Sequence, residues 1–197
     1  MPVNSPGINI FANTPPLTEA QTTGRVFFVG STAVPGGVAG VNASGAYGNS
    51  PQRPFATTDY DVGECTASRG DTIYVLPGHA EATVTGTIAM DVAAVRIIGL
   101  GIGTNRPTLT FTGTGGVIAF SAINCEWANI EHICNVASQT RMIDLQGGGD
   151  GAKIHDCMFR EGSATGLSMI EWTGAADDVW IEDNTMYAPT AGNYDEA

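Results

Sequence analysis

The sequence is poor in basic residues. Lysine occurs once, as Lys153, and eight Lys and Arg residues stand against twenty Asp and Glu, so the formal net charge is −12 at pH 7. Phosphate backbones repel a chain this acidic, which argues against nucleic-acid binding. A structural role, in which the charge keeps the protein soluble, explains the composition better.

Long apolar runs are also missing. No stretch approaches the roughly 18 apolar residues of a membrane span, and the first residues lack the basic start and apolar core of a secretory signal. We therefore expect no membrane association, and synthesis in a bacterial-type cytoplasm without export.

Cysteines are few and show no CxxC spacing. The four are Cys65, Cys125, Cys134 and Cys157. We expect them to be reduced and at least partly buried, as in a protein made in a reducing compartment.

A short pattern recurs four times in the second half of the chain. Each copy reads apolar, polar, Ile, outward residue, and the copies begin 33, 24 and 27 residues apart. The copies are Val95–Ile98, Ala128–Glu131, Ala152–His155 and Val179–Glu182. Periods of this length are typical of stacked supersecondary units that bury their apolar faces against one another.

A second strand precedes each copy. Its inward residues are Ile88, Ile118, Ile143 and Ile170, followed two positions later by Met90, Phe120, Leu145 and Trp172. This period of two is typical of a strand with one buried face. Downstream of the copies, a column of Gly99, His132, Asp156 and Asp183 predicts a bend, after which we expect a third short strand.

Three short strands per repeat predict an all-β fold, a short parallel β-helix of about five coils counted from Thr72. Helical repeats fit poorly, because the units are rich in Gly, Thr and β-branched residues. The alternative is a β-sandwich in which Ile-containing strands recur by chance.

Three regions precede or form these coils. Residues 1–24 are rich in Pro, Asn, Ser and Thr and predict an extended N-terminal arm. Residues 25–70 predict a strand, a Gly-rich loop and a capping helix, and residues 71–197 form the β-helix.

We expect the capping helix to start at Thr58, in a capping-box-like pattern with Asp61, and to end near Ala67. Laid across the open end of the solenoid, such a helix prevents end-to-end aggregation.

The arm carries one group of strong hydrophobic residues, Ile8, Ile10 and Phe11. A segment of this composition does not fold alone. We expect these residues to anchor the arm on another subunit or partner, with packing against its own domain as the alternative.

Several motifs resemble the pectate-lyase-like right-handed β-helix proteins. They are Pro54–Thr57, a short helix, Gly70–Val75, and coils bearing Ile181–Asn184. The resemblance implies a right-handed β-helix. It implies little about activity, since this architecture hosts lyases, hydrolases, tailspikes and inert structural parts.

A narrower resemblance covers roughly residues 25–190. Val29–Ser31 followed by a Gly-rich loop, and Ile73–Glu81, look like small β-helix proteins encoded by tailed bacteriophages. This resemblance implies a virion protein and a homotrimer.

Two predicted columns contain candidate chemistry. Asp144 and Glu171 fall in one outward column, where they could bind Ca²⁺ or share a proton as a catalytic pair. Two solvated carboxylates with splayed side chains are the simpler explanation. Another column places His155 between Glu131 and Glu182, which predicts a raised His155 pKa.

An outward column of Trp180, Arg96, Asn129 and Lys153 is the candidate glycan-binding face. Five coils span only about 25 Å, enough for a short saccharide. His79 has no evident acid partner in the sequence, so a Ser-His-Asp triad is unsupported.

We therefore expect a non-enzymatic virion protein without cofactors, a decoration or cement protein on the capsid exterior. Its partners are the major capsid protein and other copies of itself. The first alternative is a tail-appendage module, a tailspike or fibre part that holds host glycan near Trp180, Arg96 and Asn129. The second is a polysaccharide lyase or hydrolase that uses Asp144 and Glu171.

Overall fold

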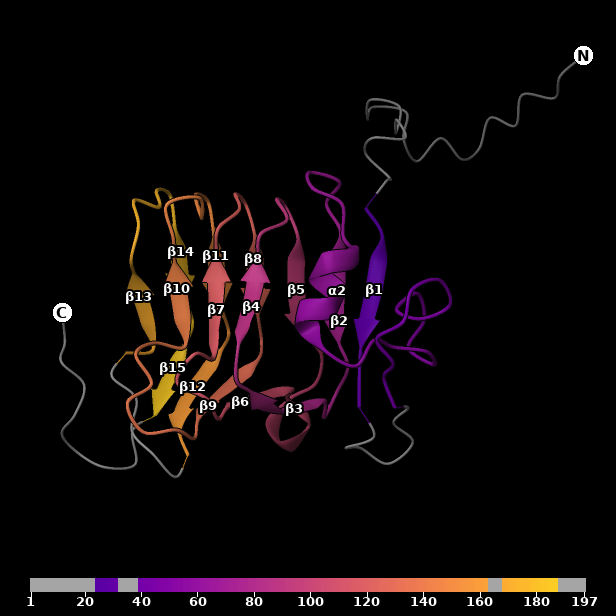
Figure 1. Ribbon diagram of the computed structural model, residues 1–197, viewed down its shortest axis with the longest axis horizontal. Helices are drawn as coiled ribbons and strands as arrows, with labels where there is room; N and C mark the ends of the chain where they lie inside the picture. The colour runs from indigo at the N-terminus through magenta and orange to yellow at the C-terminus, as the bar shows by residue number, and fades with distance from the viewer. Residues whose placement is uncertain (1–23, 32–38, 163–167, 188–197) are drawn as a thin grey trace, which may run out of the picture.

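The computed structural model describes residues 24–31, 39–162 and 168–187. Within these ranges the chain winds into a parallel β-solenoid whose coils stack along the long axis of the molecule (Figure 1). The predicted arm residues Ile8, Ile10 and Phe11 lie outside the described residues.

Three parallel sheets run along the solenoid. The six-stranded sheet contains β1 (Val26–Val29), β2 (Thr72–Val75), β5 (Arg96–Gly99), β8 (Glu126–Ala128), β11 (Lys153–His155) and β14 (Trp180–Glu182). The five-stranded sheet contains β3 (Ala80–Val84), β6 (Thr108–Phe111), β9 (Glu131–Cys134), β12 (Met158–Glu161) and β15 (Thr185–Tyr187). The four-stranded sheet contains β4 (Thr87–Met90), β7 (Val117–Phe120), β10 (Ile143–Leu145) and β13 (Ile170–Trp172).

Each coil takes one strand from each sheet in turn. The described residues form four complete coils, from β2–β3–β4 to β11–β12–β13, and β14 and β15 begin a fifth. The predicted parallel β-helix is therefore confirmed, with four complete coils where about five were expected. A 3₁₀-helix, η1 (Gly103–Asn105), interrupts the connection between β5 and β6.

The predicted inward residues of the four-stranded sheet are confirmed. Ile88, Ile118, Ile143 and Ile170 pair in register, and so do the residues two positions later. The first three of each set are buried. Burying a side chain of this size contributes about 1.5–3 kcal/mol, so each coil stabilises its neighbour.

The register of the six-stranded sheet corrects one copy of the sequence repeat. Arg96, Glu126, Lys153 and Trp180 share one column, so the second copy begins three residues earlier than predicted. Successive strands start 30, 27 and 27 residues apart. The error arose because Ile130, placed inward in the predicted copy, is also buried, but it lies just beyond the bend that follows β8.

The bends follow the predicted column at Asp156 and Asp183, whereas Gly99 is the last residue of strand β5. Asp156 and Asp183 have φ of 57° and 53°, and the third member is Asn129, with φ of 56°. Asn and Asp tolerate this left-handed conformation better than other side chains do. His132, predicted here, lies instead in β9, in the inward column of Leu109 and Phe159.

Helix α2 (Thr58–Glu64) covers the N-terminal end of the four-stranded sheet and contacts β4 (Figure 1). The Asp59 carboxylate accepts the Ala89 backbone N–H of this edge strand at 2.9 Å. The capping helix is thus present, but it ends three residues before Ala67. The predicted capping box is absent, because the N-cap is Thr57 and the Thr58 hydroxyl donates to Glu81 Oε2 at 3.0 Å instead.

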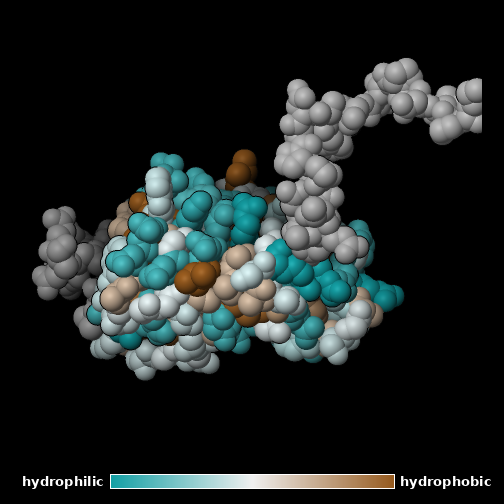
Figure 2. All heavy atoms as spheres, turned by 90° about the horizontal axis from the view of Figure 1, so that it is seen from above, coloured by the Kyte–Doolittle hydropathy of each residue, from teal (hydrophilic) through white to brown (hydrophobic). Residues whose placement is uncertain are grey.

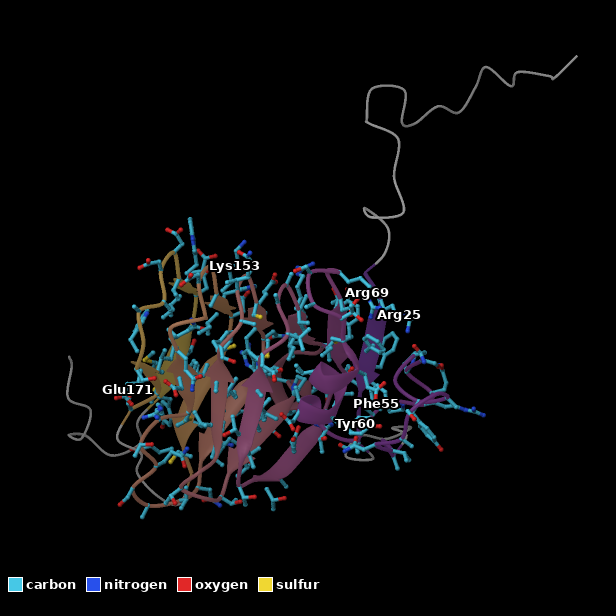
Figure 3. The ribbon with its side chains drawn as sticks, turned by 45° about the horizontal axis from the view of Figure 1, so that its top comes forward. Arg25, Phe55, Tyr60, Arg69, Lys153 and Glu171 are labelled. Carbon is cyan, nitrogen blue, oxygen red and sulfur yellow. The ribbon has the colours of Figure 1, made fainter. Side chains whose placement is uncertain are left out.

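The first strand of the six-stranded sheet is also covered at its outer edge. The Phe28 N–H donates to the Gly48 carbonyl at 2.8 Å, and the Phe55 N–H donates to the Phe28 carbonyl at 2.8 Å. Phe55 packs against Phe27 and Tyr60 at this end of the molecule (Figure 3). Two of the three edge strands at the N-terminal end of the solenoid, β1 and β4, are therefore covered.

Candidate functional site

The outward face of the six-stranded sheet carries most of the predicted glycan-binding residues. Arg96, Glu126, Lys153 and Trp180 follow one another across β5, β8, β11 and β14. Trp180 is 60% exposed. Because three strand spacings separate it from Arg96, the two side chains start about 14 Å apart on a shared face.

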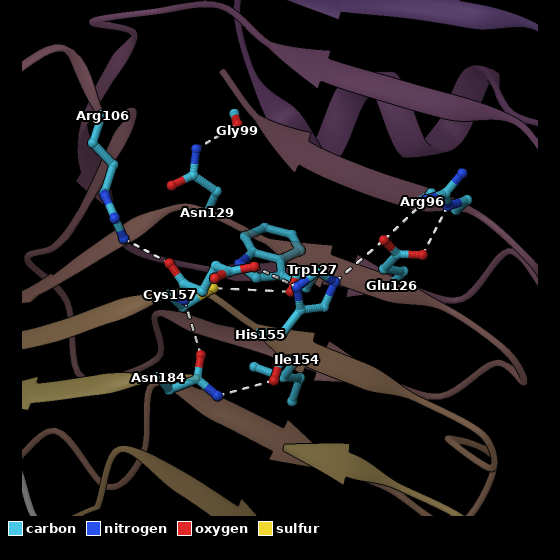
Figure 4. Close-up of polar contacts among 11 residues, drawn as sticks. Arg96, Gly99, Arg106, Glu126, Trp127, Asn129, Ile154, His155, Cys157 and Asn184 are labelled. Carbon is cyan, nitrogen blue, oxygen red and sulfur yellow. Dashed lines mark hydrogen bonds and ion pairs between the residues drawn. The ribbon is translucent and has the colours of Figure 1, made fainter. Parts of the chain in front are cut away.

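Asn129 does not belong to this face, contrary to the prediction. It occupies the bend after β8, and its side-chain amide donates to the carbonyls of Gly99 at 2.7 Å and Gly101 at 3.0 Å (Figure 4). The amide thus ties two successive coils together.

A chain of charged groups crosses the face. Arg96 donates to Glu126 through Nε at 2.7 Å and through a terminal nitrogen at 3.1 Å (Figure 4). His155 lies between two carboxylates, with Nε2 3.3 Å from Glu126 Oε1 and Nδ1 2.8 Å from Asp156 Oδ2. When the imidazole is protonated, it and the guanidinium balance the charges of the two carboxylates.

These contacts shift two pKa values. The Arg96 hydrogen bonds hold the pKa of Glu126 below its usual range, against the opposing effect of partial burial. Partial burial acts to lower the pKa of His155, but the hydrogen bonds to Asp156 and Glu126 outweigh it and raise the pKa. Glu126 is thus held ionised, which makes it a poor general acid.

The predicted direction of the His155 shift agrees with this geometry, whereas the predicted partners do not. The column neighbours of His155 are Ala128 and Glu182, and Glu131 lies in β9 of another sheet. Glu131 is paired there with the Arg160 guanidinium on the adjacent strand.

Asp144 and Glu171 are adjacent on the outward side of the four-stranded sheet, as predicted. Arg141 lies between them, with Nε 3.2 Å from Asp144 Oδ2 and a terminal nitrogen 3.1 Å from Glu171 Oε2. Asp144 is buried, and it also accepts hydrogen bonds from Gln146 at 3.0 Å and from the Thr173 hydroxyl. The guanidinium supplies the positive charge that a bound cation would supply, which favours a structural role for the pair.

His79 is buried, and its Nε2 lies 3.6 Å from Glu81 Oε2. It therefore has an acidic neighbour that the sequence analysis did not identify. Glu81 Oε2 already accepts the N–H and hydroxyl of Thr58.

Sequence reasoning missed Glu126 and Arg141. Glu126 was missed because the repeat was aligned three residues too late, which placed Asn129 in its column. Arg141 precedes β10 and lies outside the periodic positions, so no column could identify it. Because the sequence predicted that Asp144 faces solvent, no signal in the sequence indicated that its carboxylate would need a partner such as Arg141.

The three clusters hold no recognisable metal centre. In the described ranges, no three His, Cys, Asp or Glu side chains are arranged to hold a metal ion. The four cysteines are free, with Cys125, Cys134 and Cys157 buried and Cys65 half-buried.

Hydrophilic side chains cover much of the face shown in Figure 2, with strongly hydrophobic ones scattered among them. The helices of the described part of the chain are too short or too polar to cross a bilayer. No protein-family model, curated protein or solved structure matches the chain.

Proposed function

We propose that this chain is a non-enzymatic structural protein of a tailed-bacteriophage virion, which decorates the capsid exterior and reinforces the shell. The geometry that supports a structural role is a solenoid in which guanidinium groups of the same molecule engage four of the outward carboxylates. Arg96 pairs with Glu126, Arg141 with Asp144 and Glu171, and Arg160 with Glu131. Carboxylates that are paired in this way stabilise the surface of the solenoid, and they are poorly placed to act on a substrate.

The phage assignment rests on the resemblance of residues 25–190 to small β-helix proteins of tailed phages. The major capsid protein and further copies of this chain are the proposed partners. Homotrimer formation follows from the same resemblance and from the prevalence of closed symmetric assemblies.

The test is binding of the purified full chain to assembled, undecorated capsids, followed by co-sedimentation. We expect saturable binding, and weaker binding by the arm variant I8D/I10D/F11D. Ile102→Asp is the matched control, because Ile102 is an apolar residue that is 83% exposed and lies beside η1. Failure of the wild-type chain to bind would contradict the capsid assignment.

A tail-appendage module is the second candidate, favoured by the exposed Trp180 on the charged face of the six-stranded sheet. Aromatic rings of this kind stack on sugars, and Arg96 and Lys153 supply donors nearby. Under this alternative the chain binds immobilised host-surface glycan but not capsids, and Trp180→Ala abolishes the glycan binding. Sugar cleavage that is lost in Asp144→Asn would instead support a lyase or hydrolase.

A further inference from the structure

The C-terminal end of the solenoid exposes its core. Trp172 continues the inward column of Leu145, and Met186 continues that of Phe159. Leu145 and Phe159 are fully buried, whereas Trp172 is 51% and Met186 56% exposed. In the part of the chain that the structure describes, no strand pairs with the outer edges of β13, β14 and β15.

The two ends of the solenoid therefore differ. At the N-terminal end, α2 contacts β4, and Gly48 and Phe55 bond the edge of β1. At the other end, three strand edges and apolar core residues are left uncovered by the described residues, which is the arrangement that templates the addition of another strand.

The open end is also acidic. Residues 168–187 contain five carboxylates and no Lys, Arg or His. They are Glu171, Asp177, Asp178, Glu182 and Asp183. Arg25 and Arg69 lie at the opposite end of the molecule from Glu171 (Figure 3). Two open ends facing each other would bring like charges together, and at the other end of a second copy two of the three edge strands, β1 and β4, are covered, so stacking of whole solenoids is disfavoured.

The N-terminal arm has the properties that this end requires. Ile8, Asn9 and Ile10 alternate apolar and polar residues, as a strand with one buried face does. Residues 1–24 carry a single acidic side chain, Glu19, and Arg25 follows directly. The arm therefore adds little negative charge beside the acidic rim.

We propose that residues 8–11 of one copy add as a strand to the open C-terminal end of a neighbouring copy. Ile8 and Ile10 pack on Trp172 and Met186 there, and the backbone pairs with an edge strand of the last coil. This mode gives affinity through main-chain hydrogen bonds and specificity through alternate side chains.

The reach of the arm allows this exchange. Phe11 precedes Gly24 by thirteen residues (24 − 11), and thirteen extended residues span at most about 43–47 Å. The arm leaves the solenoid beside β1, and the open end of the same molecule lies about 24 Å away along the six-stranded sheet. Docking on its own end would require the arm to run the length of the solenoid, whereas a neighbour can present its open end directly.

Each copy donates one arm and accepts one, so the contact is heterologous. Such contacts close into rings when the rotation permits and otherwise form open chains. A ring of three would give the homotrimer that the phage resemblance implies. These contacts join copies of this chain and do not require the capsid.

The test uses two full-length variants that each disable one half of the contact. I8D/I10D disables the arm, and Met186→Asp disables the open end, with Ile102→Asp as the matched control. Sedimentation velocity at micromolar concentration should show oligomers for wild type and the control. Each disabled variant alone should be monomeric, with association at least about tenfold weaker, as for a central interface residue. An equimolar mixture of the two should form a 1:1 heterodimer, because one intact arm meets one intact end.

Other outcomes overturn the proposal. Wild-type-like oligomers of both variants would place the contact elsewhere, and oligomers kept by I8D/I10D but lost in Met186→Asp would place it between two open ends. If the wild-type protein is monomeric, the open end is covered by something other than a neighbour's arm: the chain's own arm, residues 188–197 or another protein. Oligomers lost in both variants without heterodimer formation would exclude reciprocal exchange. Because Met186→Asp could perturb the last coil, Trp172→Asp is tested in parallel, and circular dichroism and thermal melting must match wild type for each protein used.

Discussion

The indole N–H of Trp127 donates to Nε2 of His132 at 2.9 Å inside the solenoid. The imidazole stacks on Phe159, with ring centroids 4.5 Å apart, and Nδ1 lies 3.3 Å from the Met158 carbonyl. Both side chains are fully buried. The pair therefore satisfies two polar groups that would otherwise be costly in the core, with Nδ1 protonated and Nε2 as the acceptor.

Replacing His132 by Leu should destabilise the protein at neutral pH by about 1–3 kcal/mol, because the Trp127 N–H and the Met158 carbonyl lose their partner. Burial lowers the pKa of His132 to about 3, so the folded state resists protonation. Its contribution to stability is present above the unfolded-state pKa and is lost as pH falls from about 6.5 toward 3. Urea unfolding at pH 7 and pH 4.5 should show a smaller acid-induced loss for H132L than for wild type. Equal losses would contradict the neutral buried imidazole.

Asp61 should make the protein less stable as pH rises. It lies in α2 with no exposed surface, and neither carboxylate oxygen has a partner among the described residues. Burial, with the nearby charges of Glu64 and Asp71, raises its pKa to about 8. The folded state holds a proton that the unfolded state releases near pH 4, so stability falls between about pH 4 and pH 8.

Asp61→Asn should flatten this dependence, because the amide does not titrate. We expect the variant to exceed wild type in unfolding free energy at pH 8 and to approach it at pH 4. Asp59→Asn on the exposed side of the same helix is the control. A wild-type pH slope that persists in D61N would assign the effect to another group.

His155→Ala should cost more at pH 5 than at pH 8. The raised pKa means that the charged imidazole stabilises the folded state below the unfolded-state pKa, and that this stabilisation is lost as pH rises through the folded-state pKa. Since His155 is 27% and Asp156 60% exposed, the effect should not exceed about 1 kcal/mol. Thermal melting at both pH values measures it, and a larger cost at pH 8 would contradict the assignment.

Arg141→Met should destabilise the protein by roughly 2–4 kcal/mol, because it leaves the buried Asp144 carboxylate without its cation. Adding Asp144→Asn should recover part of the loss by removing the uncompensated charge. A double-mutant cycle by urea unfolding measures the coupling. Strictly additive losses would show that the pair contributes no net interaction.

The sequence predicted the register between strands correctly in the four-stranded sheet but not throughout the six-stranded sheet. In the four-stranded sheet, Ile at every inward position aligned all four strands. In the six-stranded sheet, Trp127 replaces Ile at the inward position of β8. The repeat was therefore aligned on the nearby Ile130 instead of on Trp127. A strand shifted by three residues still presents an apolar residue inward, so only the hydrogen-bond ladder separates the two registers.

His132 illustrates the same limit for the core. A histidine beside a predicted bend reads as a polar turn residue, because polar side chains are costly to bury. The hydrogen bond from Trp127 offsets the cost of burying this histidine. Trp127 lies on the preceding strand of the same coil, and its indole N–H reaches the imidazole only in the folded coil.

The sequence by itself determined the class of fold, since alternating apolar residues repeated at intervals near 27 allow little except stacked parallel strands. It also determined the acidic net charge. The tertiary structure alone decided which charges pair and which end of the solenoid is closed. Both depend on contacts between residues about thirty positions apart, such as Arg96 with Glu126 and Asp59 with Ala89. Local pattern carries no information about such contacts until the register between coils is known.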